Sequence, residues 1–315
     1  HSELVDQRDV DVALRVLDDL GGFSDLEARC LVRAGRDDRR VHLIDEVGNN
    51  ENIILHTGCE VTAAEGFVGN FRSTISTKDG LTKTIDHGIG IMATGGRPLR
   101  PREYGYGRIP NVVTSLEFDR LFKLKEQHAV KAKSIAFIQC VGSRDAKLNH
   151  LWCSKICCGS TLRMAGLIHA KQPESEISFF YIDVQTFGRD FISFYRRVQE
   201  EVRMIRAIPG DIFETPEGQL RVTYIADDTR ETIEETFDCV VLSVGLQPCK
   251  ESLEVAGQLN LKVGGSGFVT PSEIDGEAFN NGVFSAGAVG GPMGIAESIA
   301  SAGEASLKIL KYLEA

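Results

Sequence analysis

Four of the chain's eight cysteines lie within nineteen positions, at Cys140, Cys153, Cys157 and Cys158. Eight cysteines are too few for a disulfide scaffold in a chain of 315 residues. Grouped thiols in such a chain more often bind a metal or carry out redox chemistry. The polar SRDAKLNH run after Cys140 and the lysine at Lys155 are also unusual neighbours for thiols that only fill a core. The spacing therefore predicts a chemical site.

Several kinds of chemistry suit these cysteines. A redox pair formed by Cys157 and Cys158 requires a strained ring and leaves the other two thiols unexplained. Four thiolates can hold zinc, although structural zinc sites usually take their ligands from paired C-x2-4-C knuckles. A [4Fe–4S] cluster suits adjacent cysteines better, because its four corners are spread over a wide body. The cluster is favoured, and the other two chemistries stay as alternatives.

Basic residues accompany the cysteines. Arg144, Lys147, Lys155 and Arg163 lie in or beside the cysteine segment. Four thiolates on an iron–sulfur cube leave a net negative charge, which nearby cations offset. Arg144 and its neighbour Ser143 are expected to tune the cluster.

The sequence predicts alternating strands and helices, and these elements must position the site. Short, nearly continuous apolar runs predict buried strands at 52–56, 88–93, 134–139, 176–184, 238–244 and 282–286. Helical spacing predicts helices at 161–171, 191–206 and 295–313. Alternation of this kind indicates a doubly wound α/β fold.

Two segments have a different pattern, and the first forty residues are hard to interpret. Residues 57–84 and 211–235 alternate as antiparallel strands do, with a turn at Pro216-Glu217-Gly218. Near the N-terminus, 11–20 and 24–32 are expected helices. The sequence has no G-x-G-x-x-G run to open a nucleotide-binding unit.

Three glycine motifs each follow an expected strand: IGIMATGGRP at 89–98, VVLSVGLQP at 240–248 and GVFSAGAVGGPMG at 282–294. Glycine at a strand end lets the chain turn and lets a ligand approach the backbone closely. The motifs resemble the crossover strands and the flavin-closing motif of flavoproteins with two dinucleotide-binding domains. On that resemblance, the expected FAD contacts are Thr94, Gly95, Gly287 and Ile295.

The composition excludes some functions. A formal net charge of −10, with dispersed basic residues, argues against a nucleic-acid partner. No apolar run is long enough to span a membrane and no secretory leader is recognisable, so a cytoplasmic location is expected. The chain starts at His1 without an initiator methionine, which is typical of a piece of a longer protein.

A family resemblance then becomes specific. FIQCVGSRD followed by C-x3-CC resembles the A subunit of heterodisulfide reductase and its bacterial relatives. GFVGNF at 66–71, EYGYGRIPNVVTSLEFDRL at 103–121, VVLSVGLQP and GVFSAG extend the resemblance over roughly 41–313. The family implies a thioredoxin-reductase-like flavoprotein fold with two dinucleotide-binding domains and antiparallel insertions. It also implies a [4Fe–4S] cluster on Cys140, Cys153, Cys157 and Cys158 near FAD.

The resemblance implies an organisation as well. Residues 1–120 are expected to form a partial FAD-type domain, 121–245 an iron–sulfur domain in the position of a nicotinamide-binding domain, and 246–315 the return to the FAD-type domain. Arg144 is included among the cofactor contacts. The other cysteines, Cys30, Cys59, Cys239 and Cys249, match no part of the motif and are expected to be structural.

The expected function is electron transfer between FAD, the cluster and iron–sulfur partner subunits of a larger redox complex, with a homodimer also considered. FAD is an open question for this chain alone, because the glycine loop that normally opens the flavoprotein body is absent. Two alternatives are a nicotinamide-linked disulfide reductase using Cys157 and Cys158, and an assembly scaffold without cofactors.

Overall fold

The computed structural model describes residues 14–17, 45–124, 132–185, 191–269 and 282–313. The chain divides into two compact units. Unit 1 comprises His1–Arg97 and Gln247–Ala315, and unit 2 comprises Pro98–Leu246. The chain passes between them at β6 (Arg97–Pro98) and β15 (Leu246–Gln247), which pair as a short two-stranded ribbon.

Unit 2 is built on a parallel sheet of five strands in the order β10-β9-β8-β14-β7. The strands are β7 (Val112–Thr114), β8 (Ser134–Val141), β9 (Glu176–Phe180), β10 (Arg203–Ile205) and β14 (Cys239–Val244). All six residues of β14 are buried, as are all but the first of β8. Burial on both faces explains their continuous apolar sequences, as expected for a parallel sheet covered on both sides.

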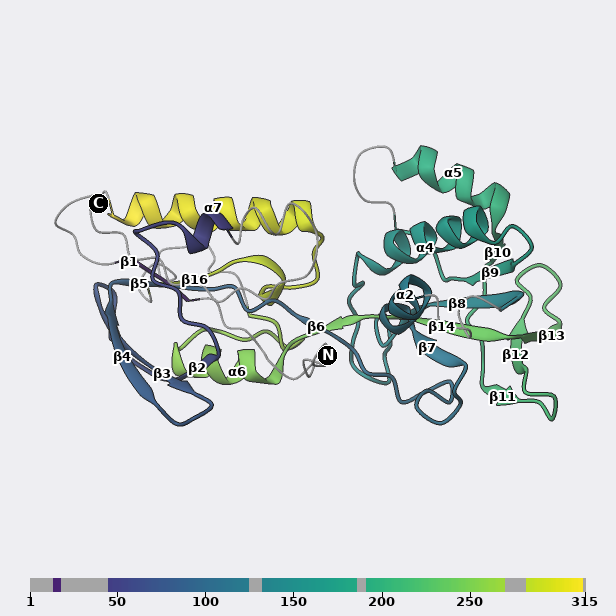
Figure 1. The fold of residues 1–315 in the computed structure, drawn as a ribbon, viewed down its shortest axis with the longest axis horizontal. Coiled ribbons are helices and arrows are strands. Elements are labelled where there is room, and N and C mark those ends of the chain that lie inside the picture. The colour runs from purple at the N-terminus through teal and green to yellow at the C-terminus, as the bar shows by residue number, and fades with distance from the viewer. Residues whose placement is uncertain (1–13, 18–44, 125–131, 186–190, 270–281, 314–315) are drawn as a thin grey trace. The chain divides into compact units, whose positions relative to one another are not determined.

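The two faces of this sheet carry different layers (Figure 1). Ile135 and Phe137 of β8 pack with the helices α2 (Ser115–Lys123), α4 (Cys157–Lys171) and α5 (Phe191–Glu201). Ala136 and Ile138 face the other way, toward the antiparallel strands β11 (Ile212–Glu214), β12 (Leu220–Ile225) and β13 (Thr232–Phe237). Successive side chains of one strand thus enter different cores, because the side chains of a strand alternate between its faces.

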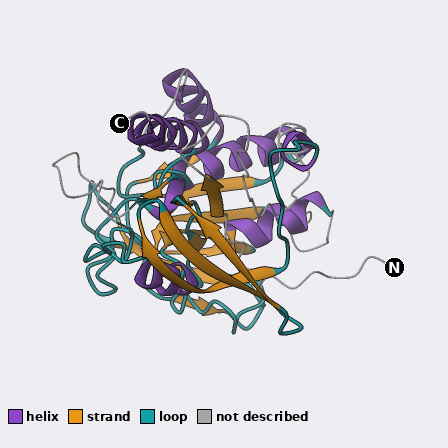
Figure 2. Ribbon diagram, turned by 90° about the vertical axis from the view of Figure 1, so that its left-hand side faces the viewer, coloured by secondary structure: helices purple, strands orange, loops and turns teal. Residues whose placement is uncertain are grey.

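Unit 1 also has a central sheet, which is smaller, with a helix on one face and antiparallel strands on the other. Its strands run in the order β1 (Leu14–Leu17), β5 (Ile89–Met92) and β16 (Val283–Ser285), with β16 parallel to β5. Ile89 and Ile91 pack against α7 (Ile295–Leu313), whereas Met92 faces the strands β2 (Cys59–Phe67), β3 (Asn70–Thr77) and β4 (Thr82–His87) and helix α6 (Lys250–Gln258). Figure 2 shows the twisted antiparallel strands in orange.

Most of the expected elements are present. The parallel strands at 88–93, 134–139, 176–184, 238–244 and 282–286, the helices at 161–171 and 295–313, and both antiparallel segments match described elements. This mixed α/β arrangement confirms the expected fold class. None of the described helices has the length and apolar character to cross a membrane.

Three local expectations were wrong. Residues 52–56 form no strand: Leu55 is exposed and Ile53 donates to the carbonyl of Asn50 in a turn. The helix expected at 191–206 ends at Glu201, since the following residues pair with β9 as β10. Part of the helix expected at 11–20 is the strand β1, which pairs with β5. The helix expected at 24–32 lies outside the described residues.

The first unit boundary falls at Arg97, whereas the sequence placed a domain boundary at 120. Residues 98–120 belong to unit 2 because β7 pairs with β14 and Phe118 of α2 is fully buried against the parallel sheet. The second boundary, at Leu246, lies within one residue of the expected 245. The cofactor type of each domain stays a prediction.

Candidate metal and redox site

All four candidate ligands belong to unit 2 and lie where its central strand ends. Cys140 is the penultimate residue of β8, Cys153 follows in the next loop, and Cys157 and Cys158 open helix α4. From β8 the chain continues through α4 to β9, which neighbours β8 within the sheet, while β14 is the neighbour of β8 on its other edge. Such a switch point, at the carboxyl ends of parallel strands, is where ligands bind in open α/β folds.

A β-bulge displaces Cys140 from the regular ladder. Between the pairs Ile138–Leu242 and Val141–Val244, β8 contains one residue more than β14. The backbone of Cys140 has a φ of 61°, in the left-handed region that costs a non-glycine residue about 1–3 kcal/mol. Bulges often redirect a side chain beside a functional site. Cys140 is therefore held in a strained conformation by the surrounding sheet.

A buried polar network ties the start of α4 to the sheet. The Gln139 side-chain amide donates to Ser243 Oγ at 2.7 Å, and Thr161 Oγ1 lies 3.1 Å from Gln139 Oε1. Thr161 Oγ1 also lies 2.7 Å from the carbonyl of Cys157. The residue before the helix, Ile156, provides no side-chain cap. The first turn of α4, with both adjacent cysteines, is thus fixed against β8 and keeps N–H groups that favour an anion.

The loop between Cys140 and Cys157 is closely held. Asp145 and His150 exchange two backbone hydrogen bonds of 2.9 Å, and Trp152 Nε1 donates to the carbonyl of Leu246 at 2.9 Å. The backbone N–H of Lys155 lies 3.3 Å from Cys153 Sγ and donates to it. Donation of this kind stabilises a thiolate and is a common feature of iron–sulfur ligands.

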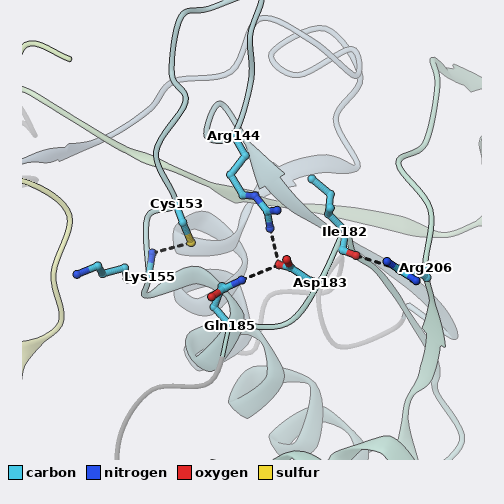
Figure 3. Close-up of polar contacts among 7 residues, drawn as sticks. All are labelled: Arg144, Cys153, Lys155, Ile182, Asp183, Gln185 and Arg206. Atoms are coloured by element: carbon cyan, nitrogen blue, oxygen red, sulfur yellow. Dashed lines mark hydrogen bonds and ion pairs between the residues drawn. The ribbon is translucent and has the colours of Figure 1, made fainter. Parts of the chain in front are cut away.

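Arg144 is anchored beside the cysteines (Figure 3). Its guanidinium forms an ion pair with Asp183, in the segment after β9, and Gln185 Nε2 donates to the same carboxylate at 2.9 Å. The Arg144 backbone is also left-handed, with a φ of 55°. The position of Arg144 is compatible with its expected role beside the cysteines, and its flavin contact stays a prediction.

The pKa values of Cys140, Cys157 and Cys158 are shifted by burial and by the neighbouring thiols. Burial, followed by the charge of Cys158, raises the pKa of Cys140 to about 12. The pKa of Cys157 is also raised, first by its hydrogen bond to Cys158. That same bond lowers the pKa of Cys158. The backbone N–H of Gln185 and the charge of Arg144 lower this pKa further. Within the adjacent pair, the thiolate form is therefore favoured at Cys158 and disfavoured at Cys157.

The residues have the character of a cluster site, although their arrangement is not that of a single-ion site. Among the described residues, no three His, Cys, Asp or Glu side chains are grouped to hold one metal ion. The donor set, the N–H group directed at Cys153 and the cation at Arg144 all suit a thiolate cluster. The buried Ser143 hydroxyl, 2% exposed, has no hydrogen-bond partner among the described residues.

A disulfide between the adjacent cysteines suits this backbone poorly. All seven described cysteines are free thiols. Cys157 and Cys158 are both helical, and consecutive Cα atoms lie about 3.8 Å apart, whereas disulfides usually need roughly 4.4–6.8 Å. The described cysteines outside the motif, Cys59, Cys239 and Cys249, are buried. Cys30 lies outside the described residues.

Three of the expected flavin contacts follow neighbouring strands of unit 1. Thr94 and Gly95 come after β5, and Gly287 comes after β16, which is parallel to β5. Gly95 has a φ of 70° and open space where a Cβ would lie. The Gly287 N–H donates to Ser301 Oγ of α7 at 3.1 Å, which brings α7 alongside. Ile295, the first residue of α7, is 76% exposed.

Some polar groups at or beside the expected FAD contacts already have partners in unit 1. The Gly294 N–H, before α7, donates to Glu297 Oε2 at 2.9 Å, so the helix begins beside a carboxylate. Thr94 Oγ1 accepts a hydrogen bond of 2.7 Å from Ser252. A pyrophosphate placed at this helix N-terminus would meet the charge of Glu297. The fit to FAD is therefore weaker than the fit of the cysteines to a cluster.

The sequence did not identify Asp183, Gln185 or the network around Gln139. Asp183 and Gln185 do follow a strand at the carboxyl edge of the sheet, which is a signal that could have been used. The network of Gln139, Ser243 and Thr161 leaves no such signal, because it depends on strand order.

The fold is that of two-domain flavin oxidoreductases. It is similar to the thioredoxin reductase of Lactococcus lactis, with a TM-score of 0.57, 16% identity and coverage of 92% of each chain. It is also similar to the thioredoxin reductase of T. acidophilum, with a TM-score of 0.56, 16% identity and coverage of 88% of this chain and 79% of that one. These likenesses define the class of fold, thioredoxin-reductase-like, and confirm that expectation.

Curated relatives then identify the family. The chain is 35% identical over 243 residues to the A subunit of H(2):CoB-CoM heterodisulfide,ferredoxin reductase of Methanothermobacter thermautotrophicus, covering 71% of this chain and 37% of that protein. It is 35% identical over 234 residues to an iron–sulfur A subunit of CoB–CoM heterodisulfide reductase of Methanopyrus kandleri, covering 69% and 36%. No protein-family model matches the chain.

The chain belongs to the family of heterodisulfide reductase A subunits, which are oxidoreductase subunits. The resemblance found in the sequence is thereby confirmed. The matched region spans about a third of the length of these curated relatives.

Proposed function

We propose that this chain is an electron-transfer part of a heterodisulfide reductase-like complex and that Cys140, Cys153, Cys157 and Cys158 hold a [4Fe–4S] cluster. One observation carries the proposal: Cys140 near the carboxyl end of β8, Cys153 in the loop that follows, and Cys157 and Cys158 at the start of α4 are near enough for their charges to act on one another's pKa. A [4Fe–4S] cluster supplies a one-electron carrier, and FAD converts two-electron to one-electron transfer.

The protein's own groups suit that role. The strained backbone at Cys140 and the network around Gln139 fix the thiols in advance. The Lys155 N–H and the Arg144 guanidinium favour the thiolate forms. The buried Ser143 hydroxyl is available as a further donor. Together these groups reduce the charge of a thiolate site and set its reduction potential.

FAD is proposed for the assembled complex, with Thr94, Gly95, Gly287 and Ile295 as its contacts in unit 1. The cofactor contact expected of Arg144, in unit 2, stays a separate prediction. Iron–sulfur subunits are the proposed partners, and a cytoplasmic location is proposed with them. The Methanosarcina mazei relative is named as the A subunit of a ferredoxin:CoB-CoM heterodisulfide reductase, which supports one-electron partners; it is 31% identical over 73% of this chain and 31% of that protein.

The test is anaerobic reconstitution with iron and sulfide, followed by iron, sulfide and flavin assays. We expect Cys153→Ala and Cys157→Ala to lose reconstituted iron and the buried control Cys239→Ala to retain it. Equal iron in all three variants would contradict the ligand set. A dithiol titration that shows a redox pair without iron would favour the disulfide reductase, and a protein without iron, flavin or redox activity would favour the scaffold.

A further inference from the structure

Three exposed apolar side chains lie in the segment that carries the cysteines. Leu148 is 46% exposed, Leu151 is 70% exposed and Ile156 is 38% exposed. Leu151 precedes Cys153 by two positions and Ile156 directly precedes Cys157. One residue spans at most about 3.6 Å, so both stand within roughly 7 Å of a cysteine along the backbone. Scattered exposed leucines are normal, whereas a group beside a reactive site indicates an interaction surface. We call Leu148, Leu151 and Ile156 the apolar rim.

The apolar rim is presented by an ordered backbone. The Asp145 carboxylate accepts the N–H groups of Lys147 at 2.7 Å and Leu148 at 3.3 Å, and so closes the turn that carries Leu148. The Arg144 N–H donates to the carbonyl of Trp152 at 3.0 Å, directly after Leu151. A surface ordered in advance loses little conformational entropy when a partner binds. These exposed side chains thus have the rigidity that a recognition surface needs.

The charge around the apolar rim differs from that of the whole chain. Residues 146–173 contain no Asp or Glu and four Lys or Arg, in a chain of net charge −10. Lys147 is exposed at the tip of the turn. Its electrostatic neighbours include Asp145, which is engaged by backbone N–H groups, and Glu103. A local excess of cations on an acidic protein selects an acidic partner and steers its approach.

We propose that the apolar rim, together with Lys147, Lys155 and Arg163 of the same chain segment, is the docking surface for a small acidic one-electron carrier protein. Its role in electron transfer rests on the proposed function, whereas the surface itself consists of residues that are not ligands. One electron leaves the reduced carrier and enters the cysteine-bound cluster; the carrier is oxidised by one electron, and no covalent bond forms or breaks. Such redox encounters are typically small and short-lived.

The experiment measures binding of an acidic bacterial ferredoxin to the full chain by calorimetry at low and high salt, before and after reconstitution with iron. We expect binding that weakens with salt. The double variant Leu148→Ser, Leu151→Ser should weaken it at least tenfold. Lys147→Glu should weaken it and also reduce its salt dependence. Circular dichroism checks that each variant is folded.

Matched controls come from unit 1. Leu81 is 71% exposed, close to the exposure of Leu151, and Lys83 is exposed two residues later in β4. Leu81→Ser and Lys83→Glu should leave ferredoxin binding unchanged. Absence of binding by the unmodified chain, or equal losses in rim and control variants, would overturn the proposal. It would also be overturned if the rim variants abolished self-association, measured by sedimentation, and left ferredoxin binding intact.

Iron analysis of the same samples separates this proposal from the proposed function. A chain that takes up no iron but binds ferredoxin through the apolar rim contradicts the cluster and supports the surface. A chain that loads iron but binds ferredoxin equally well without the rim supports the cluster and overturns the surface.

Discussion

The Arg144 guanidinium and the Asp183 carboxylate form an ion pair that joins the segment after β8 to the segment after β9 (Figure 3). Both charges act on the thiols, in opposite directions: Arg144 lowers the pKa of Cys158 and Asp183 raises it. The pair therefore adjusts the charge of the site as well as its geometry.

This relationship predicts opposite shifts in the reduction potential of the reconstituted cluster. Arg144→Gln removes a cation, so reduction should become harder and the potential more negative. Asp183→Asn removes an anion and should make it more positive. At partly exposed positions each change is worth roughly 1 kcal/mol, or about 40 mV for one electron. Redox titration monitored by electron paramagnetic resonance measures both, and shifts of the same sign would contradict this account.

Two buried serines should respond in opposite ways to alanine substitution. Ser143 has a buried hydroxyl without a partner among the described residues, so Ser143→Ala should leave the metal-free protein equally stable or more stable. Ser154 Oγ accepts the Leu246 N–H at 2.8 Å, so Ser154→Ala should cost about 1–3 kcal/mol. Urea unfolding of the metal-free variants measures both.

The reduction potential of the reconstituted cluster gives a second measurement of the role of Ser143. If its hydroxyl donates to the cluster, Ser143→Ala should shift the potential to a more negative value, because a hydrogen bond to sulfur is lost. An unchanged potential, together with a large loss of stability in the metal-free protein, would assign Ser143 a structural role only.

The left-handed backbone of Cys140 predicts an unusual preference for glycine. Cys140→Gly relieves the steric cost of a φ of 61°, whereas Cys140→Ser keeps that cost and buries a hydroxyl. The glycine variant should therefore be more stable than the serine variant by about 1 kcal/mol in its metal-free form. Denaturant titration compares them, and a more stable serine variant would contradict the strain.

The sequence predicted the elements whose pattern is local. α7 begins and ends where its periodicity indicated, and the cysteine segment led to the start of α4. Features that depend on pairing were missed. The bulge at Cys140 arises from the register of β8 against β14, and Arg203–Ile205 is a strand only because β9 lies beside it. No composition or spacing encodes the partner of an ion pair such as Arg144 and Asp183.

Acid sensitivity is expected at a second ion pair of unit 2. Arg203 donates to both carboxylate oxygens of Glu235 at 2.7 Å, and this hydrogen bonding lowers the pKa of Glu235. A lowered pKa in the folded state gives stability that is present above the unfolded value of about 4.3 and is lost as the pH falls through the folded value. Glu235→Gln should lose less stability than the unmodified chain between neutral and acidic pH. Unfolding at a series of pH values measures the difference, and identical profiles would contradict it.

Cys140, Cys153, Cys157 and Cys158 are proposed to hold one cluster. The most direct measurement is the Mössbauer spectrum and iron content of the anaerobically reconstituted chain. We expect about four irons per chain and the spectrum of a [4Fe–4S] centre, both lost in Cys153→Ala. A stoichiometric zinc content in place of iron, or a full [4Fe–4S] spectrum in Cys153→Ala, would contradict it.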